Sequence, residues 1–178
     1  MERYFSKFNV EIIDEKFRND LIIATKTAVV SLFDDNNEVI EQLKLAVVLP
    51  ETIYKKIDNA EPLIFPHSYI DGFSLSNYRK DSGEQTKIKI YDLNFENSFF
   101  DYSNVEQSKI DFVNVEFAGE LTNFKNSAFV RATEISFSNS LFSGSVSFEY
   151  SLFNNLDVDF SNTIFKGQSV SFKNAIFK

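Results

Sequence analysis

The residues best suited to catalysis are few and isolated in this chain. The single histidine, His67, lies in a loop bounded by prolines, and the neighbouring sequence supplies neither the oriented partner nor the pocket that a general base needs. The many serines of the second half lack a paired histidine that would activate a hydroxyl as a nucleophile. Because the chain has no cysteine, thiolate catalysis and zinc–cysteine sites are excluded. We predict no catalytic residue and no enzymatic activity.

The best candidate for a cation site is the run Asp34-Asp35, which is followed by Asn36 and Glu38. Calcium loops carry a glycine at their centre, and this run has none, so a solvated turn is the favoured interpretation. A glycine-rich loop that would hold a phosphate is also missing. We predict no metal site and no cofactor.

Two carboxylates near the end of the chain, Asp157 and Asp159, flank Val158 on an expected strand and therefore point outward together. Catalytic carboxylates would need burial or a nearby partner to tune their pKa values. As part of a solvated face, these carboxylates need neither burial nor a partner. Asp159→Ala is therefore expected to leave stability nearly unchanged. Together with Glu149 and Glu134, they form the predicted acidic surface for a partner.

These carboxylates belong to a repeat that runs from Leu93 to the end of the chain. One phrase recurs: phenylalanine, any residue, a polar turn-former or tyrosine, a small or β-branched residue, any residue, and phenylalanine again. The first phenylalanines of the copies are spaced 17, 12, 13, 11, 12 and 12 residues apart. Such a period dictates a repeat architecture. The copies begin at Phe95, Phe112, Phe124, Phe137, Phe148, Phe160 and Phe172.

The spacing within and between phrases predicts very short strands joined by turns. Alternation of apolar residues lasts only one step, which suits strands of two or three residues rather than a helix. Asparagine tolerates a left-handed backbone, and it stands two residues after the first phenylalanine at positions 97, 114, 126, 139, 162 and 174. After the second phenylalanine we expect similar freedom at Gly119, Gly144, Gly167 and Asn155. This pattern favours a solenoid over an antiparallel sandwich or a disordered phenylalanine-rich tract.

The phenylalanines of the phrases are expected to stack along the interior of this solenoid. Phe160→Ala should then cost about 3 to 5 kcal/mol through an unfilled cavity. The predicted core ladder is Phe112, Phe117, Phe124, Phe129, Phe137, Phe142, Phe148, Phe153, Phe160, Phe165, Phe172 and Phe177.

This segment resembles the pentapeptide-repeat proteins, which place a large apolar residue at the centre of each five-residue unit and a small one two positions earlier. Phe153, Phe165 and Phe177 match the centre, and Ser151, Thr163 and Ala175 match the small position. The seven-residue step between phrases departs from that pattern. The resemblance implies a mainly β fold, with a right-handed quadrilateral β-helix of about three to four coils over residues 87–178.

The composition of residues 1–86 differs from that of the repeat. This difference predicts a small α+β or β capping domain at the N-terminus of the solenoid. Residues 8–13 alternate like a strand, and residues 28–33 and 38–48 flank the Asp34-Asp35 turn. Helices over residues 14–25 and 37–47 are the alternative. Pro50 begins a short expected helix, Pro62 and Pro66 mark a loop, and residues 77–86 form a polar link to a strand at 87–91.

Composition and charge limit the partners that this chain can bind. The net charge of −8 disfavours direct contact with nucleic acid or an anionic membrane, because phosphate contacts depend on lysine and arginine. No apolar run approaches the length of a membrane span, and no apolar signal core follows the N-terminus. A cytoplasmic protein with a protein partner is the expectation.

Three functions fit these observations. The first is a non-enzymatic scaffold for protein–protein interaction, with an acidic β-helical surface. The second is implied by the resemblance: a DNA mimic that binds or protects a type II topoisomerase such as gyrase. The third is an immunity or anti-defence protein that blocks a toxin or a host factor. Phe177-Lys178 lies directly on a repeat, so we also expect either a longer protein or a homodimer through the uncapped C-terminal coil.

Overall fold

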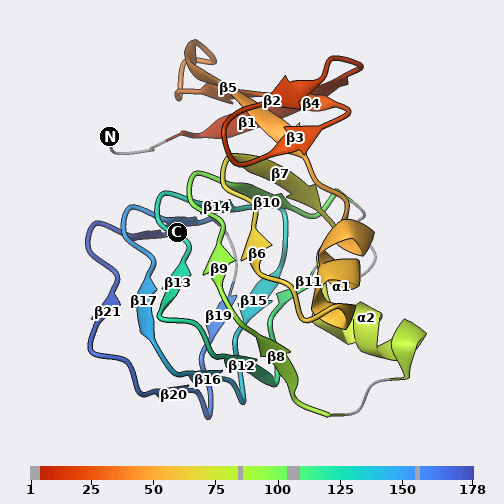
Figure 1. Cartoon of the computed structure of the whole chain (residues 1–178). Coiled ribbons are helices and arrows are strands. Elements are labelled where there is room, and N and C mark those ends of the chain that lie inside the picture. Colours follow the sequence, from red (N-terminus) through yellow and green to blue (C-terminus); the bar gives the residue numbers. More distant parts are fainter. Residues whose placement is uncertain (1–4, 84–85, 104–108, 155–156) are drawn as a thin grey trace.

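The structure is a computed structural model that describes residues 5–83, 86–103, 109–154 and 157–178. It is built from short strands and two helices, α1 (Pro50–Asp58) and α2 (Leu75–Ser82). Most strands have two to four residues and stack as the rungs of a coil with four walls (Figure 1). An antiparallel layer at the N-terminus lies against one of the walls.

Each wall is a parallel sheet, which we name A to D. Wall A holds β7 (Ser68–Asp71), β10 (Phe99–Asp101), β14 (Ala128–Phe129), β18 (Leu152–Phe153) and β22 (Ile176–Phe177). Wall B holds β11 (Lys109–Asp111), β15 (Glu134–Ser136) and β19 (Asp157–Asp159). Wall C holds β8 (Ile88–Ile90), β12 (Val115–Phe117), β16 (Leu141–Phe142) and β20 (Ile164–Phe165). Wall D holds β6 (Leu63–Ile64), β9 (Leu93–Asn94), β13 (Leu121–Asn123), β17 (Ser145–Ser147) and β21 (Val170–Ser171).

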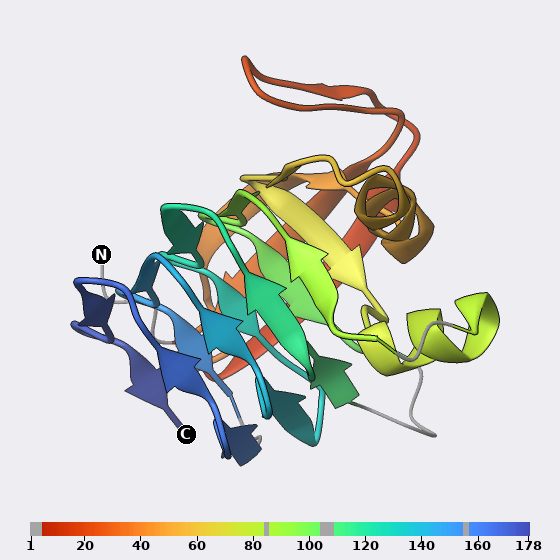
Figure 2. The same cartoon turned by 60° about the horizontal axis from the view of Figure 1, so that its bottom comes forward.

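The chain visits walls A, B, C and D in turn, so successive coils lie side by side as Figure 2 shows. Strands in the same wall pair in parallel, as in the register of Phe100 with Phe129 and of Phe129 with Phe153. This arrangement confirms the predicted mainly β, quadrilateral β-helix. The parallel pairing excludes the antiparallel sandwich of short strands.

The parallel stack begins at Leu63, ahead of the expected boundary at residue 87. The run Phe65-Pro66-His67-Ser68-Tyr69-Ile70 is a further copy of the phrase: His67 has the same left-handed backbone (φ 55°) as the turn asparagines. The backbone N–H of His67 donates to the carbonyl of Glu96 in the next coil (2.8 Å). The expected loop at Pro62 and Pro66 is therefore part of the first coil.

Helix α2 occupies the place in the first coil where later coils have a strand of wall B. Ser74 forms a parallel bridge with Asp111 of β11, and the chain turns into α2 at the next residue. The Ser74 hydroxyl caps the helix by accepting from the N–H of Asn77, and Gly83 ends it in a left-handed conformation. Within the polar stretch 77–86, which was expected to link the N-terminal part to the strand at 87–91, Asn77 to Ser82 therefore form a capped helix.

The turns of the phrases have the predicted backbone. Asn97, Asn114, Asn126, Asn139, Asn162 and Asn174 all have φ between 54° and 58°, and Tyr150 takes the equivalent place with φ 58°. The glycines after the second phenylalanine do not share this conformation. An added Cβ at Gly144 would collide with the backbone of Gly119 and Glu120. These glycines therefore permit close approach between coils, which corrects the predicted role, and Asn155 lies outside the described residues.

The interior holds four columns of aromatic rings, which are stacked except for the tilted pair Phe73–Phe112. Ring centroids of neighbours within a column lie 4.3 to 5.9 Å apart. The columns are Phe65–Phe95–Phe124–Phe148–Phe172, Phe100–Phe129–Phe153–Phe177, Phe73–Phe112–Phe137–Phe160 and Phe117–Phe142–Phe165.

Burial of the ladder depends on whether another coil covers it. Eight of the predicted phenylalanines, from Phe112 to Phe153, are fully buried. In the last coil Phe160, Phe165 and Phe172 are only partly buried, and Phe177 is 55% exposed. Four members were absent from the predicted ladder and join it here: Phe65, Phe73, Phe95 and Phe100.

The small residues beside the rings carry hydroxyl groups, and a buried hydroxyl needs a hydrogen-bond partner. Ser127 and Ser151 donate to the carbonyls of Phe95 and Phe124 in the preceding coil (2.6 and 2.7 Å). Ser140 and Thr163 do the same on the opposite side, toward Phe112 and Phe137 (2.9 and 2.8 Å). Each hydroxyl therefore links two coils as well as leaving room for the phenylalanine.

The N-terminal part is β-rich, with β1 (Lys7–Ile13), β4 (Thr27–Phe33) and β5 (Val39–Val47) forming an antiparallel sheet. The short hairpin of β2 (Phe17–Arg18) and β3 (Ile23–Ala24) lies against β5. The predicted strands are confirmed, and the alternative helices over 14–25 and 37–47 do not form. The predicted helix at Pro50 is confirmed as α1, with the proline in its first turn.

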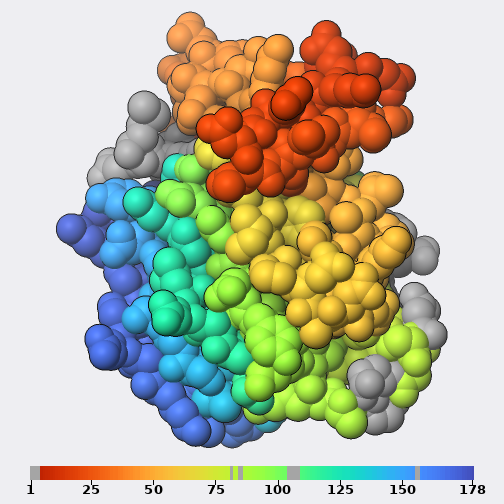
Figure 3. All heavy atoms as spheres, viewed as in Figure 1, coloured from red at the N-terminus to blue at the C-terminus, as the bar shows by residue number. Residues whose placement is uncertain are grey.

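This N-terminal layer covers the outer surface of wall A. Strand β5 pairs in parallel with β7, so wall A and the layer form one sheet that folds over itself. The outward column of wall A is apolar and consists of Tyr69, Phe99, Ala128, Leu152 and Ile176. It packs against apolar residues of β1, β4 and β5, and Phe8 lies 5.1 Å from Phe99 between ring centroids. In the space-filling view the orange layer rests directly on the green coils (Figure 3).

Candidate protein-interaction surface

The predicted site residues outside the repeat have structural roles. His67 forms a left-handed turn, and its Nε2 lies 3.4 Å from the Asn97 side-chain amide. Asp34 caps the β4–β5 turn, where its carboxylate accepts from the N–H groups of Asn36 and Glu38 (2.9 Å each). Within the described ranges, no group of three or more histidine, aspartate or glutamate side chains is placed to hold a metal ion. No described helix is long and apolar enough to cross a membrane.

Because phenylalanine rings fill the interior, partners can reach the outer walls of the coil and the exposed side of its last described rungs. Three of the four predicted acidic residues lie on wall B. Glu134 on β15 and Asp157 on β19 are direct register neighbours, and Asp159 follows on the same strand. Glu149 lies apart, on the turn between walls D and A. We call Glu134, Asp157 and Asp159 the acidic wall.

Intramolecular contacts already engage part of this charge. Lys109 pairs with Glu134 across the rungs of wall B (2.6 Å). At the other corner, Ser171 donates to the carboxylate of Glu149 (2.7 Å). Asp157 is exposed, so it offers the most accessible carboxylate of the four to a partner.

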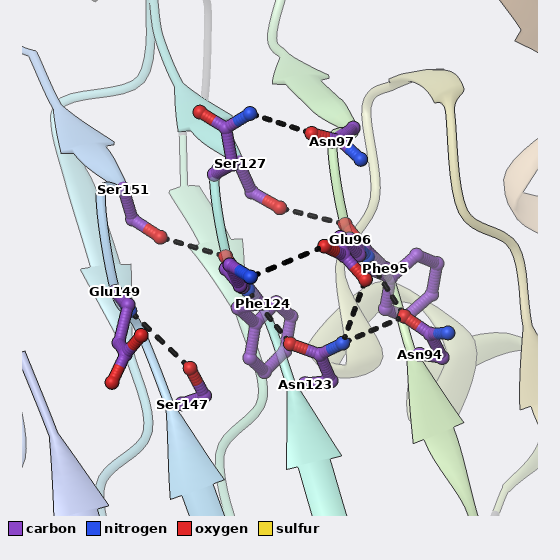
Figure 4. A network of polar contacts seen from close by, with 12 residues as sticks. Asn94, Phe95, Glu96, Asn97, Asn123, Phe124, Ser127, Ser147, Glu149 and Ser151 are labelled. Atoms are coloured by element: carbon purple, nitrogen blue, oxygen red, sulfur yellow. Dashed lines mark hydrogen bonds and ion pairs between the residues drawn. The ribbon is translucent and has the colours of Figure 1, made fainter. Parts of the chain in front are cut away.

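Asp159 has a local role that the sequence interpretation missed. Its carboxylate accepts from the N–H of Ser161 (2.8 Å) and from the hydroxyl of Ser136 in the preceding coil (3.1 Å). These bonds, the one from Ser161 above all, lower the pKa of Asp159 from its ordinary value. In the equivalent turn bonds, the Asn94 side chain accepts from the N–H of Glu96 (Figure 4), and the Asn123 side chain accepts from the N–H of Lys125. In these three phrases, the residue before the first phenylalanine therefore caps the turn.

This cap corrects the expectation that Asp159→Ala leaves stability unchanged. We expect Asp159→Ala to lower the free energy of unfolding by about 0.5 to 1.5 kcal/mol, because two hydrogen bonds are lost at a partly exposed site. The lowered pKa means that the carboxylate stabilises the fold above the ordinary pKa of aspartate. That contribution disappears as the pH falls through the lowered value. Urea unfolding of wild type and variant at neutral and acidic pH measures both effects.

Asp157→Ala is the matched control for the cap, since the exposed Asp157 lies two residues away on the same strand. We expect it to change stability by less than about 0.5 kcal/mol. A loss for Asp157→Ala as large as that for Asp159→Ala would contradict the capping role.

Walls C and D have a different character. On wall C, Lys89 and Glu116 face each other across the first rungs (3.5 Å), and Leu141 and Ile164 follow in the same outward column. Wall D presents amides and hydroxyls, with the Asn123 amide donating to the Asn94 side chain (3.2 Å) (Figure 4). Wall B differs from walls C and D in that its last described rung carries two aspartates.

The spacing of charge on wall B can be compared with that of DNA. Coils stack at about the distance between neighbouring strands, roughly 4.8 Å, whereas duplex DNA carries one charge per about 1.7 Å. Lys109 also offsets one of the carboxylates on this wall. The acidic wall is therefore sparser in charge than the duplex that a DNA mimic has to imitate.

Comparison with known proteins supports the repeat directly. The family model described as pentapeptide repeats (9 copies) matches residues 132–176. This match covers the coils in which the phrases recur most regularly, from the turn before β15 to β22. No curated protein and no solved structure gives a significant match to the chain. Over residues 132–176, the chain therefore carries the repeats of the pentapeptide-repeat family.

Proposed function

We propose that this protein is a non-enzymatic scaffold that binds a partner protein in the cytoplasm through an outer wall of its β-helix. The observation that carries the proposal is the use of wall A within the molecule itself. Its outward column, from Tyr69 to Ile176, is covered by the antiparallel N-terminal layer, with Phe99, Ala128 and Leu152 fully buried under it. A flat wall of this coil is therefore a surface on which another protein layer can pack.

The acidic wall is the part of the remaining surface that we assign to the partner. Asp157 is exposed, and the hydrogen bonds from Ser161 and Ser136 hold the carboxylate of Asp159 in place on the same strand. Carboxylates at adjacent rungs favour arginine or lysine side chains of a partner, and charge complementarity of this kind governs specificity and association rate more than affinity. The partner is accordingly expected to present a basic patch.

Affinity capture with charge-reversal variants tests this proposal. We expect Asp157→Lys to abolish or strongly reduce capture of the partner that wild type retains from a lysate of the source cell. Reversal places a lysine where the basic patch of the partner has to dock, and like charges in contact disfavour binding. Quantitative mass spectrometry of the retained proteins measures the change.

Glu149→Lys is the matched control, because it alters the net charge of the chain equally but lies on the turn between walls D and A. We expect capture by this variant to equal that of wild type. If both variants lose the partner equally, net charge rather than the acidic wall governs binding, and the assignment is wrong.

The identity of the captured protein separates the remaining functional alternatives. A type II topoisomerase, together with inhibition of gyrase supercoiling at micromolar protein, would favour the DNA mimic. A toxin or host factor would favour an immunity or anti-defence role. Association through the last coil remains a proposal as well, and replacement of the exposed Phe177 by aspartate tests it, because a dimer held by that coil would dissociate.

A further inference from the structure

The N-terminal strand β1 presents an uncovered edge of the largest sheet. In the strand order of this sheet, β1 is the end strand and pairs only with β4 among the described residues. It has seven residues and contains neither proline nor a bulge in its pairing. An edge of this length exposes a row of backbone N–H and C=O groups that can pair with another strand.

The side chains of β1 are complementary to a second copy of the same strand. In an antiparallel pairing centred on Val10, Phe8 lies opposite Ile12 of the second copy, and Asn9 lies opposite its Glu11. Lys7 is then diagonal to Glu11 of the second copy, within reach of a long side chain. Each contact occurs twice, because a two-fold axis passes through Val10.

We propose that two copies of this chain associate through antiparallel pairing of their β1 strands, which joins their sheets into one. The burial pattern supports this occupant. Ile12 is 45% exposed although it lies in the same alternating set as Phe8 and Val10, which pack into the apolar cluster beneath the layer. Phe8 of the second copy covers Ile12 in the proposed register, so the pairing extends the cluster across the two-fold axis.

The surroundings of β1 leave room for an incoming strand. A groove of about 320 Å³ lies beside the start of β1 and is lined by Ser6, Lys7, Phe8, Arg131, Ala132 and Asn154. Lys7 supplies positive charge to this groove, whereas the guanidinium of Arg131 is paired with Asp101. The segment of the second copy that would enter it follows Ile13 and begins with Asp14 and Glu15. Charge complementarity therefore accompanies the pairing at both ends of the strand.

The test uses exposed charges, so that the variants keep their fold. Sedimentation equilibrium over micromolar to near-millimolar protein is expected to show a monomer–dimer equilibrium for the wild type. Lys7→Glu and Glu11→Lys should each weaken it by about tenfold, because each change brings like charges together twice. The double variant Lys7→Glu/Glu11→Lys restores the opposite pairing and should return to the wild-type dissociation constant. Thermal unfolding of each variant confirms that it is folded.

Hydrogen exchange provides an independent readout. Backbone amides of Lys7–Ile13 on the free edge should exchange more slowly at high than at low protein concentration. A wild type that stays monomeric throughout this range would overturn the proposal. So would a dimer that all three charge variants leave unchanged, including one that only Phe177→Asp dissociates, because association would then proceed through the last coil.

Discussion

Phe137→Ala is expected to lower the free energy of unfolding by about 3 to 5 kcal/mol, through the cavity that the missing ring leaves. Phe137 is fully buried and is stacked between Phe112 and Phe160, with centroids 5.0 and 5.1 Å away and planes within 6° of parallel. The neighbouring coils are held by backbone hydrogen bonds and cannot collapse into the space. Chemical denaturation followed by tyrosine fluorescence and far-ultraviolet circular dichroism measures the loss.

The last coil supplies matched controls for this prediction. Phe177 is 55% exposed, so Phe177→Ala should cost about 1 kcal/mol or less, and the partly buried Phe160 should fall between the two. The sequence alone predicts a larger loss of unfolding free energy for Phe160→Ala, because the repeat pattern does not reveal that the last described coil is covered on one side only. Equal losses at Phe137 and Phe177 would contradict the stacked interior.

Asp101→Ala is expected to cost about 3 kcal/mol, because it removes the acceptor of a buried network. Asp101 is fully buried at the end of β10. It accepts hydrogen bonds from the Tyr69 hydroxyl (2.7 Å), the N–H of Tyr102 (2.8 Å) and Nε of Arg131 (2.7 Å). Burial, followed by the bond to Asp101, raises the pKa of Tyr69, so the phenol stays neutral and donates. Thermal and urea unfolding measure the cost.

Two comparisons make the Asp101 prediction specific. Tyr69→Phe removes one donor and leaves the ion pair of Asp101 with Arg131, so it should cost only about 0.5 to 1.5 kcal/mol. Arg131 is half-exposed, so its guanidinium can turn toward water when Asp101 is removed. The loss expected for Asp101→Ala therefore lies at the lower end of the range for a broken buried ion pair. The hypothesis fails if Tyr69→Phe destabilises the protein as much as Asp101→Ala does.

The Asp101 network also connects the N-terminal layer to the coils. The guanidinium of Arg131 lies 4.8 Å above the ring of Phe8 in β1, while its nitrogens hold Asp101 in wall A. Lys178, next to β22, donates to the carbonyl of Phe5 at the start of the layer (3.1 Å). Both contacts tie the layer to wall A at its free side, opposite the β5–β7 pairing.

The repeat made the C-terminal fold predictable because the same physical requirements recur in every coil. A phenylalanine that fills the interior, an asparagine that accepts a left-handed turn and a serine small enough to lie beside the ring appear at constant offsets. The first copy, from Phe65 to Ile70, does not stand out in the sequence, because α2 and longer turns separate it from the next copy at Phe95. The offset of Phe65, His67 and Ser68 is the signal that could have located it.

Other features depend on contacts that a sequence pattern does not contain. Gly144 looks like a flexible turn residue, yet its place is set by the backbone of the preceding coil. The sequence predicts a solvated carboxylate at Asp159. Only the hydrogen bonds from Ser161 and Ser136 identify this side chain as the cap of a turn. Alternation showed that Asp157 and Asp159 share a strand, but the separation of Glu149 from them follows from the order of the walls.

Titration calorimetry of the captured partner against wild type, Asp157→Lys and Glu149→Lys measures binding through the acidic wall directly. We expect Asp157→Lys to weaken binding by about tenfold or more and Glu149→Lys to bind like wild type. Equal affinities for all three proteins, or equal losses for both variants, would contradict binding through the wall formed by β11, β15 and β19.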